Sequence, residues 1–410
     1  MSMKKFFGKL CMGGVFLFSL SMSLTSCEGA LDDILGEWSR PTPGSSTGGA
    51  VTSIGLDPDE MTLAVGDKGQ LTAKVDPAGT AVTWSSDKEE IATVDANGLV
   101  TAVAMGTAII TAKAGDKTAT CEVTVTPDLS TPLTVEAITA GTIKVTSPKA
   151  GMQYSLNGDA KQAVTTDAIP VAVGDKVAFY GNGISITKYS GTMIAGGTAD
   201  IKVYGNIMSL VDETGFATLS DPITLPADDT FSKLFKDNAK LTDASGLLLP
   251  AMTLKDKCYE GMFYGCTSLT TAPAELPAMA LKANCYQGMF YNCTNLAVAP
   301  KELPAPMLTG YCYSFMFYGC KVLTTAPKLP ATTGNLATAC YNNMFSGCTS
   351  LTTAYVKAEY TATGGACTNM FNGCTNAAGS TFYSKDAATA DTWKSTFGLS
   401  SWASGVYPTE

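Results

Sequence analysis

The sequence predicts a multidomain, mainly β-structured protein: an all-β sandwich, a second small β module, and then an α/β solenoid of stacked repeats. Short runs in which apolar and polar residues alternate fill the first half of the chain, as in half-buried strands. In the second half, a motif with two cysteines recurs about every 27 residues, a period typical of stacked-coil proteins. The length of 410 residues leaves room for two or three domains.

The composition argues against several kinds of site. Hydrophobic residues make up 45% of the chain and charged residues 15%, as in proteins with folded cores. The formal net charge is −9, and Arg40 is the one arginine, so we expect no nucleic-acid partner, because phosphate binding needs a basic surface. The absence of histidine excludes imidazole bases, Ser-His-Asp and Cys-His nucleophile systems, and histidine-containing metal sites. We therefore expect no catalytic activity, no metal and no cofactor.

Residues 1–27 are interpreted as a lipoprotein signal peptide. Three lysines precede an uncharged run over residues 10–24, which is shorter than the ~20 residues of a membrane span but fits a secretory signal. The run ends in Leu24-Thr25-Ser26-Cys27, which resembles a bacterial lipobox. The resemblance implies cleavage before Cys27, lipidation of its thiol, and anchoring through acyl chains. An ordinary signal peptide that happens to contain a cysteine is the alternative.

The segment after Cys27 is expected to be a tether. Glu28, Asp32 and Asp33 resemble the surface-export signal of Bacteroidetes lipoproteins, which implies a lipid-anchored protein of the outer membrane, exposed at the cell surface. Acidic residues in a solvated tether would also arise by chance. Residues 28–50 are rich in Pro, Gly, Ser and Thr and are expected to form a flexible linker.

Residues 51–127 predict a sandwich of about seven short strands separated by turn signals. The segments that carry a family resemblance are Val82-Thr-Trp84-Ser85-Ser86, Ile91-Ala-Thr-Val94-Asp95 and Asn97-Gly98-Leu99-Val100-Thr101-Ala102. They resemble the bacterial immunoglobulin-like group 2 domain. The resemblance implies a spacer or an adhesive stalk and no chemistry of its own.

Residues 128–205 predict a second small β-rich module, because short apolar-polar alternations border tight turns such as Asn157-Gly158 and Gly174-Asp175. No residue of this module points to a particular chemistry.

Residues 206–380 predict the repeat solenoid, and residues 381–410 predict its C-terminal cap. The first cysteines of the five full copies are 27, 27, 28 and 27 residues apart; the copies are Cys258–Cys266, Cys285–Cys293, Cys312–Cys320, Cys340–Cys348 and Cys367–Cys374. A degenerate copy without cysteines, Phe231–Phe235 with Leu241, precedes them.

Each copy predicts one short helix followed by one strand. In C-Y-x-x-M-F-x-x-C the apolar positions 0, 1, 4, 5 and 8 would lie on one face of a helix. The residue before the second cysteine predicts a left-handed residue that ends this helix, because it is glycine or asparagine: Gly265, Asn292, Gly319, Gly347 and Gly373. Thr270–Ala272 and its counterparts are then expected to form a parallel sheet.

The array resembles the BspA-type leucine-rich repeats of Bacteroidetes surface proteins, in the variant with a cysteine at each end of the helix. This resemblance covers about residues 205–410. It implies a surface protein that binds macromolecules, in some members host matrix proteins. No binding residues carry over, because the shared positions are core positions.

The ten repeat cysteines have two structural interpretations. They are buried thiols that let neighbouring coils approach closely, or they form disulfides within each copy, such as Cys258–Cys266, which an oxidising compartment would allow. The spacing without histidine is not a zinc pattern.

Two sets of tyrosines recur once per coil. Tyr259, Tyr286, Tyr313 and Tyr341 are expected to pack beside the core. Tyr264, Tyr291 and Tyr318 are the candidate binding residues, as an aromatic ladder for sugar rings or partner side chains, with packing alone as the alternative.

The sequence thus predicts a non-enzymatic, adhesin-like surface lipoprotein whose solenoid binds a protein or a glycan of host or bacterial origin. The alternative is a glycan-binding accessory lipoprotein of a polysaccharide-capture system. An enzyme acting through carboxylates is less favoured, because no paired acids occur in a recognisable setting.

Overall fold

A computed structural model gives the fold of residues 50–181, 191–218, 223–375 and 377–408. The predicted signal peptide, Cys27 and the linker up to residue 49 lie outside these described residues. Residues 1–50 and 51–410 are separate units, and only the second is described below. None of the helices in the described ranges has the length and hydropathy of a transmembrane span.

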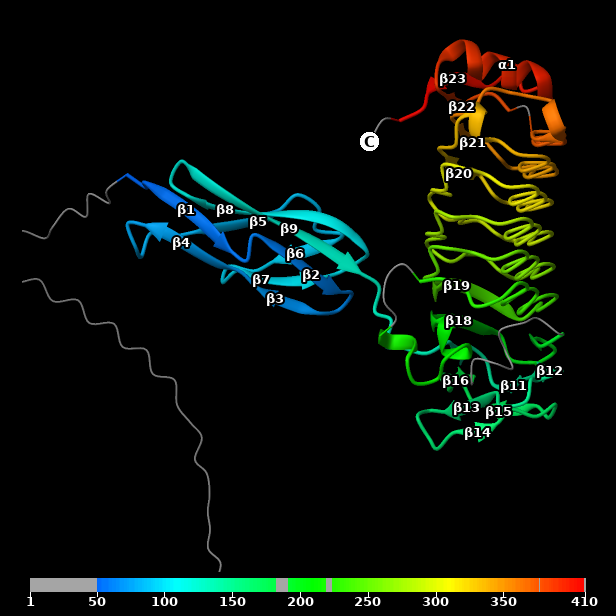
Figure 1. The fold of residues 1–410 in the computed structure, drawn as a ribbon, viewed down its shortest axis with the longest axis horizontal. Coiled ribbons are helices and arrows are strands. Elements are labelled where there is room, and N and C mark those ends of the chain that lie inside the picture. Colours follow the sequence, from blue (N-terminus) through cyan, green and yellow to red (C-terminus); the bar gives the residue numbers. More distant parts are fainter. Residues whose placement is uncertain (1–49, 182–190, 219–222, 376, 409–410) are drawn as a thin grey trace, which may run out of the picture. The chain divides into compact units, whose positions relative to one another are not determined.

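The second unit begins with an all-β sandwich, as the sequence predicts (Figure 1). Its strands form three sheets: β1 (Ser53–Asp57) with β4 (Thr72–Asp76); β2 (Glu60–Ala64), β9 (Lys117–Thr126), β8 (Gly106–Ala114) and β5 (Thr83–Ser86); and β3 (Lys68–Gln70), β7 (Leu99–Ala102) and β6 (Ala92–Val94). β2 and β9 are parallel, and the other pairs are antiparallel. Residues such as Val100, Ile110 and Cys121 alternate inward and are fully buried between the sheets.

The predicted second β module shares a sheet with the first coil of the array. The sheet has six strands in the order β14 (Gln162–Ala163), β13 (Gln153–Leu156), β16 (Lys176–Tyr180), β10 (Thr134–Ala137), β18 (Ile201–Asn206) and β19 (Leu241–Leu248). Two smaller pairs are β11 (Gly141–Ile143) with β15 (Ile169–Val171) and β12 (Val145–Thr146) with β17 (Met193–Ile194), and the 3₁₀ helices η1 (Ile207–Leu210) and η2 (Phe216–Thr218) follow. Since β18 pairs in parallel with β19, the sheet of the module continues directly into the array.

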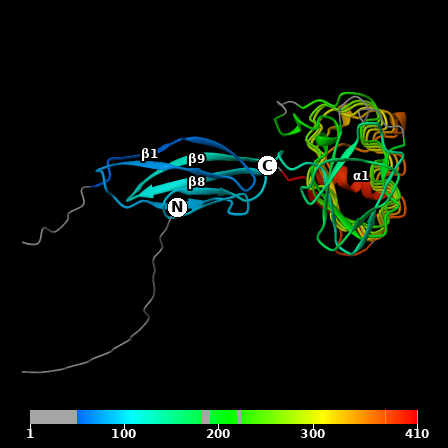
Figure 2. The ribbon, with the colours of Figure 1, turned by 90° about the horizontal axis from the view of Figure 1, so that it is seen from below.

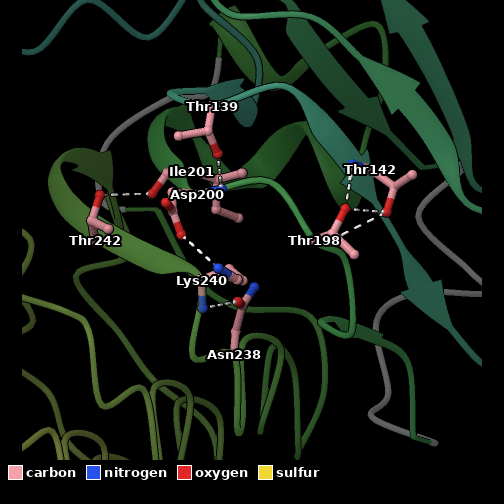
Figure 3. Close-up of polar contacts among 8 residues, drawn as sticks. All are labelled: Thr139, Thr142, Thr198, Asp200, Ile201, Asn238, Lys240 and Thr242. Carbon is pink, nitrogen blue, oxygen red and sulfur yellow. Dashed lines mark hydrogen bonds and ion pairs between the residues drawn. The ribbon is translucent and has the colours of Figure 1, made fainter.

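Polar contacts reinforce this junction (Figure 3). Lys240 Nζ lies 3.0 Å from Asp200 Oδ1, and the Thr242 hydroxyl donates a 3.0 Å hydrogen bond to the carbonyl of Ile201. Asn238, which is buried, donates its side-chain amide to the carbonyl of Ile194 at 2.9 Å and accepts the backbone N–H of Lys240 at 2.9 Å. A single buried hydrophobic cluster extends from Leu133 in the module to Trp402 in the cap. The predicted boundary between residues 205 and 206 therefore falls inside β18, within one continuous core.

Residues from 223 onward wind into stacked coils, which superpose when seen along the stack (Figures 1 and 2). Parallel bridges Asp243↔Thr271 and Thr271↔Val298 connect the early coils. The last coils pair as a parallel sheet: β20 (Thr325–Leu329), β21 (Thr353–Val356), β22 (Thr381–Ser384) and β23 (Ala403–Val406). One extended segment per coil is thus present, as expected from Thr270–Ala272 and its counterparts. The 3₁₀ helices η3 (Thr333–Asn335) and η4 (Thr363–Gly365) lie in the connections.

The predicted helix in each cysteine motif is wrong. In the copy Cys258–Cys266, the backbone N–H groups of alternate residues donate to the next coil, from Tyr259 to the Cys285 carbonyl and from Phe263 to the Met289 carbonyl at 2.8 and 2.9 Å. The residues between them donate to the carbonyl three positions earlier, as Met262 does to Tyr259 at 3.2 Å. An α-helix would instead bond each N–H four residues back within the copy.

The actual unit of this segment is a four-residue turn that repeats. Lys257, Gly261 and Gly265 have left-handed backbones with φ of 59°, 56° and 71°. The left-handed conformation predicted for Gly265 is therefore present, but it closes a turn in a flat coil and not a helix. Over the nine residues of the motif, a four-residue repeat and the 3.6-residue helical repeat place the same five positions inside, so the apolar pattern cannot distinguish them.

Buried columns of identical residues hold the coils together. The rings of one phenylalanine per coil stack with centroids 5.3 to 5.5 Å apart: Phe235, Phe263, Phe290, Phe317, Phe345 and Phe371. The last coil is covered by helix α1 (Ala387–Phe397), which begins after the capping side chain of Asp386 and ends at Gly398, with φ of 69°. Trp393 on α1 is fully buried, and Trp402 is 2% exposed. Helix α1 and the segment after it thus close the end of the core.

Candidate binding site

The three candidate tyrosines come together as one column on the surface of the array. Tyr264, Tyr291 and Tyr318 are half-buried, and each directly follows a buried phenylalanine. The ring centroids are 4.6 Å apart for the first pair and 4.7 Å for the second, with interplanar angles of 1° and 6°. Lys236 takes the equivalent position in the first copy, and its ammonium lies 5.3 Å from the Tyr264 ring centroid.

Parallel stacking determines what this column can offer to a ligand. Both faces of the Tyr291 ring are covered by its neighbours, and Lys236 lies over the ring of Tyr264. A sugar ring that binds an aromatic side chain needs a free face, because its apolar C–H groups contact the π-surface. Away from its Tyr318 end, the tyrosine column therefore presents ring edges and hydroxyl groups, and not ring faces, to a ligand.

A second column, beside the tyrosines, has a left-handed backbone in every coil. The residues at this position have φ between 53° and 60°: Lys233, Gly261, Gly288, Phe315, Asn343 and Asn369. The two successive glycines leave a gap in the surface. We call the resulting surface hollow of about 480 Å³ the glycine notch; it is lined by Lys233, Lys236, Glu260, Gly261, Tyr264, Gln287, Gly288, Tyr291 and Phe315.

Phe315 forms the aromatic end of the glycine notch. Its half-buried ring is tilted by 51° to Tyr291 and by 55° to Tyr318, at centroid distances of 6.3 and 5.9 Å. A left-handed backbone (φ 57°) is disfavoured for a bulky side chain by ~1–2 kcal/mol. The prediction from sequence missed Phe315, although the aligned copies contain the signal: a phenylalanine where the other full copies have glycine or asparagine.

Each charged group that lines the glycine notch lies near a group of opposite charge. Lys233 lies 3.6 Å from Glu260, and Lys236 lies 3.7 Å from Asp237 beside the notch. The Gln287 side-chain oxygen accepts a 2.6 Å hydrogen bond from Asn284. The walls thus carry hydrogen-bond donors and acceptors with little net charge.

The repeat cysteines are free thiols in the structure, and all except the half-buried Cys374 are fully enclosed. The thiol of the second cysteine in each copy donates a hydrogen bond to a carbonyl of the preceding coil, as from Cys266 to Phe235 at 3.0 Å and from Cys293 to Phe263 at 3.1 Å. Burial raises the pKa of Cys266 to about 12 and the pKa of Cys293 well above its ordinary value. Such thiols are protonated and unreactive near neutral pH.

The last copy has a different register from the one the cysteines suggest. The N–H of Tyr341 donates to the carbonyl of Ala366, whereas the equivalent N–H of Tyr313 donates to the carbonyl of Cys340. Ala366 therefore occupies the first cysteine position, and Cys367 occupies the position of the buried tyrosines. Those tyrosines are more buried than expected: Tyr259, Tyr286, Tyr313 and Tyr341 are at most 1% exposed.

A further surface feature, on the outer face of the parallel sheet, was also missed. Thr353-Ala-Tyr355-Val-Lys357 and Thr381-Phe-Tyr383-Ser-Lys385 repeat a Thr-x-Tyr-x-Lys pattern 28 residues apart, and the period of two brings these three side chains to one face. Tyr355 and Tyr383 stack with centroids 4.7 Å apart. Lys357 and Lys385 line a second hollow of about 480 Å³. Glu359 pairs with Lys385, and its hydrogen bond raises the pKa of that lysine.

No group of three or more Cys, Asp or Glu side chains within the described ranges has the geometry to hold a metal ion.

Comparison with known proteins identifies one domain of the chain. Residues 50–125 match the bacterial Ig-like domain (group 2), in agreement with the resemblance of residues 51–127. The match covers less than a fifth of the chain, so it identifies this domain and not the whole protein.

Similar curated proteins share only a short segment with the chain. A lacto-N-biosidase of Bifidobacterium bifidum is 46% identical over 90 residues, which cover 21% of this chain and 8% of that protein. The ice-binding protein 1 of Shewanella frigidimarina is 34% identical over 108 residues, covering 25% of this chain and 12% of that protein. An Ig-like virion protein of Serratia phage KSP90 is 45% identical over 82 residues, covering 18% of this chain and 32% of that protein. The chain thus spans about a third or less of the length of these relatives.

Among solved structures, a termite-gut GH10 xylanase that contains a bacterial Ig-like domain matches with 26% identity and a TM-score of 0.15, covering 18% of this chain and 21% of that chain. Domains 5–6 of the S-layer protein SbsC match with 17% identity and a TM-score of 0.18, covering 32% of this chain and 84% of that chain. Scores this low support no argument about the fold.

Proposed function

We propose that the protein is a non-enzymatic, lipid-anchored surface protein that uses its stacked coils to bind macromolecules, in the manner of an adhesin. In this proposal the coils are BspA-type leucine-rich repeats, with a flat four-residue-turn segment in place of the helix. Cys27 carries the lipid in the outer membrane, and the Ig-like domain acts as a spacer.

The observation that carries this proposal is the glycine notch together with the tyrosine column. The side chains of these features lie at the surface of the coils, outside the fully buried columns of the core. A regular stack of coils presents such columns over an extended face, which suits a large ligand better than a small substrate.

A second candidate function is glycan binding within a polysaccharide-capture system. The glycine notch favours it, because the notch combines aromatic rings with hydrogen-bonding groups and its charged side chains are paired. The Thr-x-Tyr-x-Lys face of the sheet would then be a separate contact surface.

The test is binding of residues 28–410 to an array of host matrix proteins and purified polysaccharides. Residues 128–410 and residues 51–127 would be compared on the same array. The cut belongs at residue 128, because a cut at 206 would remove β18, which pairs with β19 of the array, together with the other strands of the module, and expose the shared core. We expect residues 128–410 to retain binding and residues 51–127 to show none; the reverse result, or no binding by any of the three, would contradict the proposal.

A further inference from the structure

We propose that the glycine notch is a subsite for one neutral pyranose unit of a glycan, with Phe315 as the ring on which the sugar stacks. This inference rests on the proposed binding function of the array. It assigns both the ligand class and the residues.

The first argument is the backbone at position 315. Gly261, Gly288, Asn343 and Asn369, at the same position in the other full copies, are the residue types that adopt a left-handed φ most readily. Phe315 keeps the same φ of 57° at a cost that the fold does not require, because its side chain is not part of the buried core. Phe231 and Tyr311 also have left-handed backbones, so this strain points to a function only together with the open space beside Phe315.

The second argument is the position of the ring beside an open space. Gly261 and Gly288 lack the side chains that would fill the notch, and a Cβ at Gly288 would have no atom closer than the Tyr291 Cβ at 3.7 Å. Phe315 stands at the end of this gap, tilted relative to the stacked tyrosines, and both faces of the Tyr291 ring beside it are occupied. Among the aromatic rings that line the notch, Phe315 is thus the one outside the parallel stack.

The third argument is the chemistry of the walls. A pyranose has an apolar C–H face and a rim of hydroxyls that both donate and accept hydrogen bonds. The notch offers a carboxylate acceptor on Glu260, an ammonium donor on Lys233 and an amide on Gln287. The ion pairs of Lys233 with Glu260 and of Lys236 with Asp237 leave little net charge to attract an ionic group, which favours a neutral sugar over an acidic one.

The experiment uses residues 28–410 and four neutral polysaccharides as probes: a β-glucan, an α-mannan, a galactan and a xylan. Polygalacturonate, heparin and a panel of matrix proteins form the comparison arms. Phe315→Gly removes the platform and restores the residue type of the preceding coils. Gly288→Asn fills the notch with the residue type found at Asn343 and Asn369. Asn369→Gly, two coils beyond Phe315, is the matched control.

We expect the wild type to bind at least one neutral polysaccharide. Phe315→Gly and Gly288→Asn should each weaken that binding by roughly tenfold or more, while Asn369→Gly leaves it unchanged. Circular dichroism and thermal melting would establish that all variants are folded.

Two results would overturn the inference while leaving the proposed function intact: neutral-glycan binding that the notch variants do not change, and binding only to the acidic polysaccharides or the proteins. If the wild type bound none of the neutral polysaccharides, acidic polysaccharides or matrix proteins, that result would contradict both the pyranose subsite and the proposed binding function.

Discussion

Gly288 and Phe315 occupy the same position in adjacent coils and have the same left-handed backbone, with φ of 57° in each. The N–H of Gly288 and the N–H of Phe315 both donate to the next coil at 2.8 Å, so the coil path is identical whether the residue has a side chain or not. The identity of this residue is thus free of the packing that determines its neighbours.

Substitution of Phe315 should therefore have little effect on the stability of the protein. We expect Phe315→Gly to change the free energy of unfolding by less than about 1 kcal/mol, because relief of the left-handed strain offsets the lost contacts with Tyr291 and Tyr318. Phe317→Ala, two residues later in the buried column, should cost ~3–5 kcal/mol. Chemical denaturation of both variants measures the difference, and equal losses would contradict the prediction.

The repeat thiols should be inaccessible in the native protein. Residues 51–410 contain eleven cysteines, all free in the structure. We expect a thiol reagent near neutral pH to label none of the fully buried ones rapidly, because they are enclosed and their pKa values are raised. After unfolding without reductant, all eleven should react. Recovery of only one reactive thiol, Cys121, would favour the disulfide interpretation.

Alkaline pH should destabilise the array. Burial raises the pKa of Cys258 and Cys285 from 9.0 to about 12, and it raises the pKa of Tyr313 well above its ordinary value. The folded state therefore keeps protons that the unfolded chain loses above pH ~9. The contribution of these groups to the free energy of unfolding is constant below the pKa that each has in the unfolded chain. It falls above that pH, by ~1.4 kcal/mol per pH unit for each group. Denaturation midpoints measured across this range test the prediction; a midpoint that stays level up to pH ~11 would contradict it.

The junction between the β module and the first coil should depend on Asn238. Its buried amide group joins Ile194 to Lys240 through two hydrogen bonds, and it occupies the position of the second cysteine in the later copies. Asn238→Ala leaves the buried carbonyl of Ile194 without this donor, so we expect a loss of ~1–3 kcal/mol in unfolding free energy. Asn372→Ala, at an exposed position, serves as control and should be within ~0.5 kcal/mol of wild type.

The surface residues that we propose for binding were only partly evident from the chain. Periodicity identified Tyr264, Tyr291 and Tyr318, and the structure brings them into one column. Phe315 was missed because a single phenylalanine in an apolar motif looks like core. The three-dimensional path of the coil was needed to show that its position faces outward beside two glycines.

The sequence by itself determined the sandwich, the spacing of the coils, the burial of the repeated Cys, Met and Phe positions, and the left-handed residue before each second cysteine. Each of these follows from local patterns of polarity and backbone preference. Only the tertiary structure decided that the cysteine motif is a run of flat four-residue turns and not a helix. The choice depends on hydrogen bonds to the next coil, about 27 residues away, which no local pattern contains. The same long-range pairing joins β18 to β19 and merges the β module with the array. It also covers both faces of the Tyr291 ring, while Phe315 stands beside an open notch.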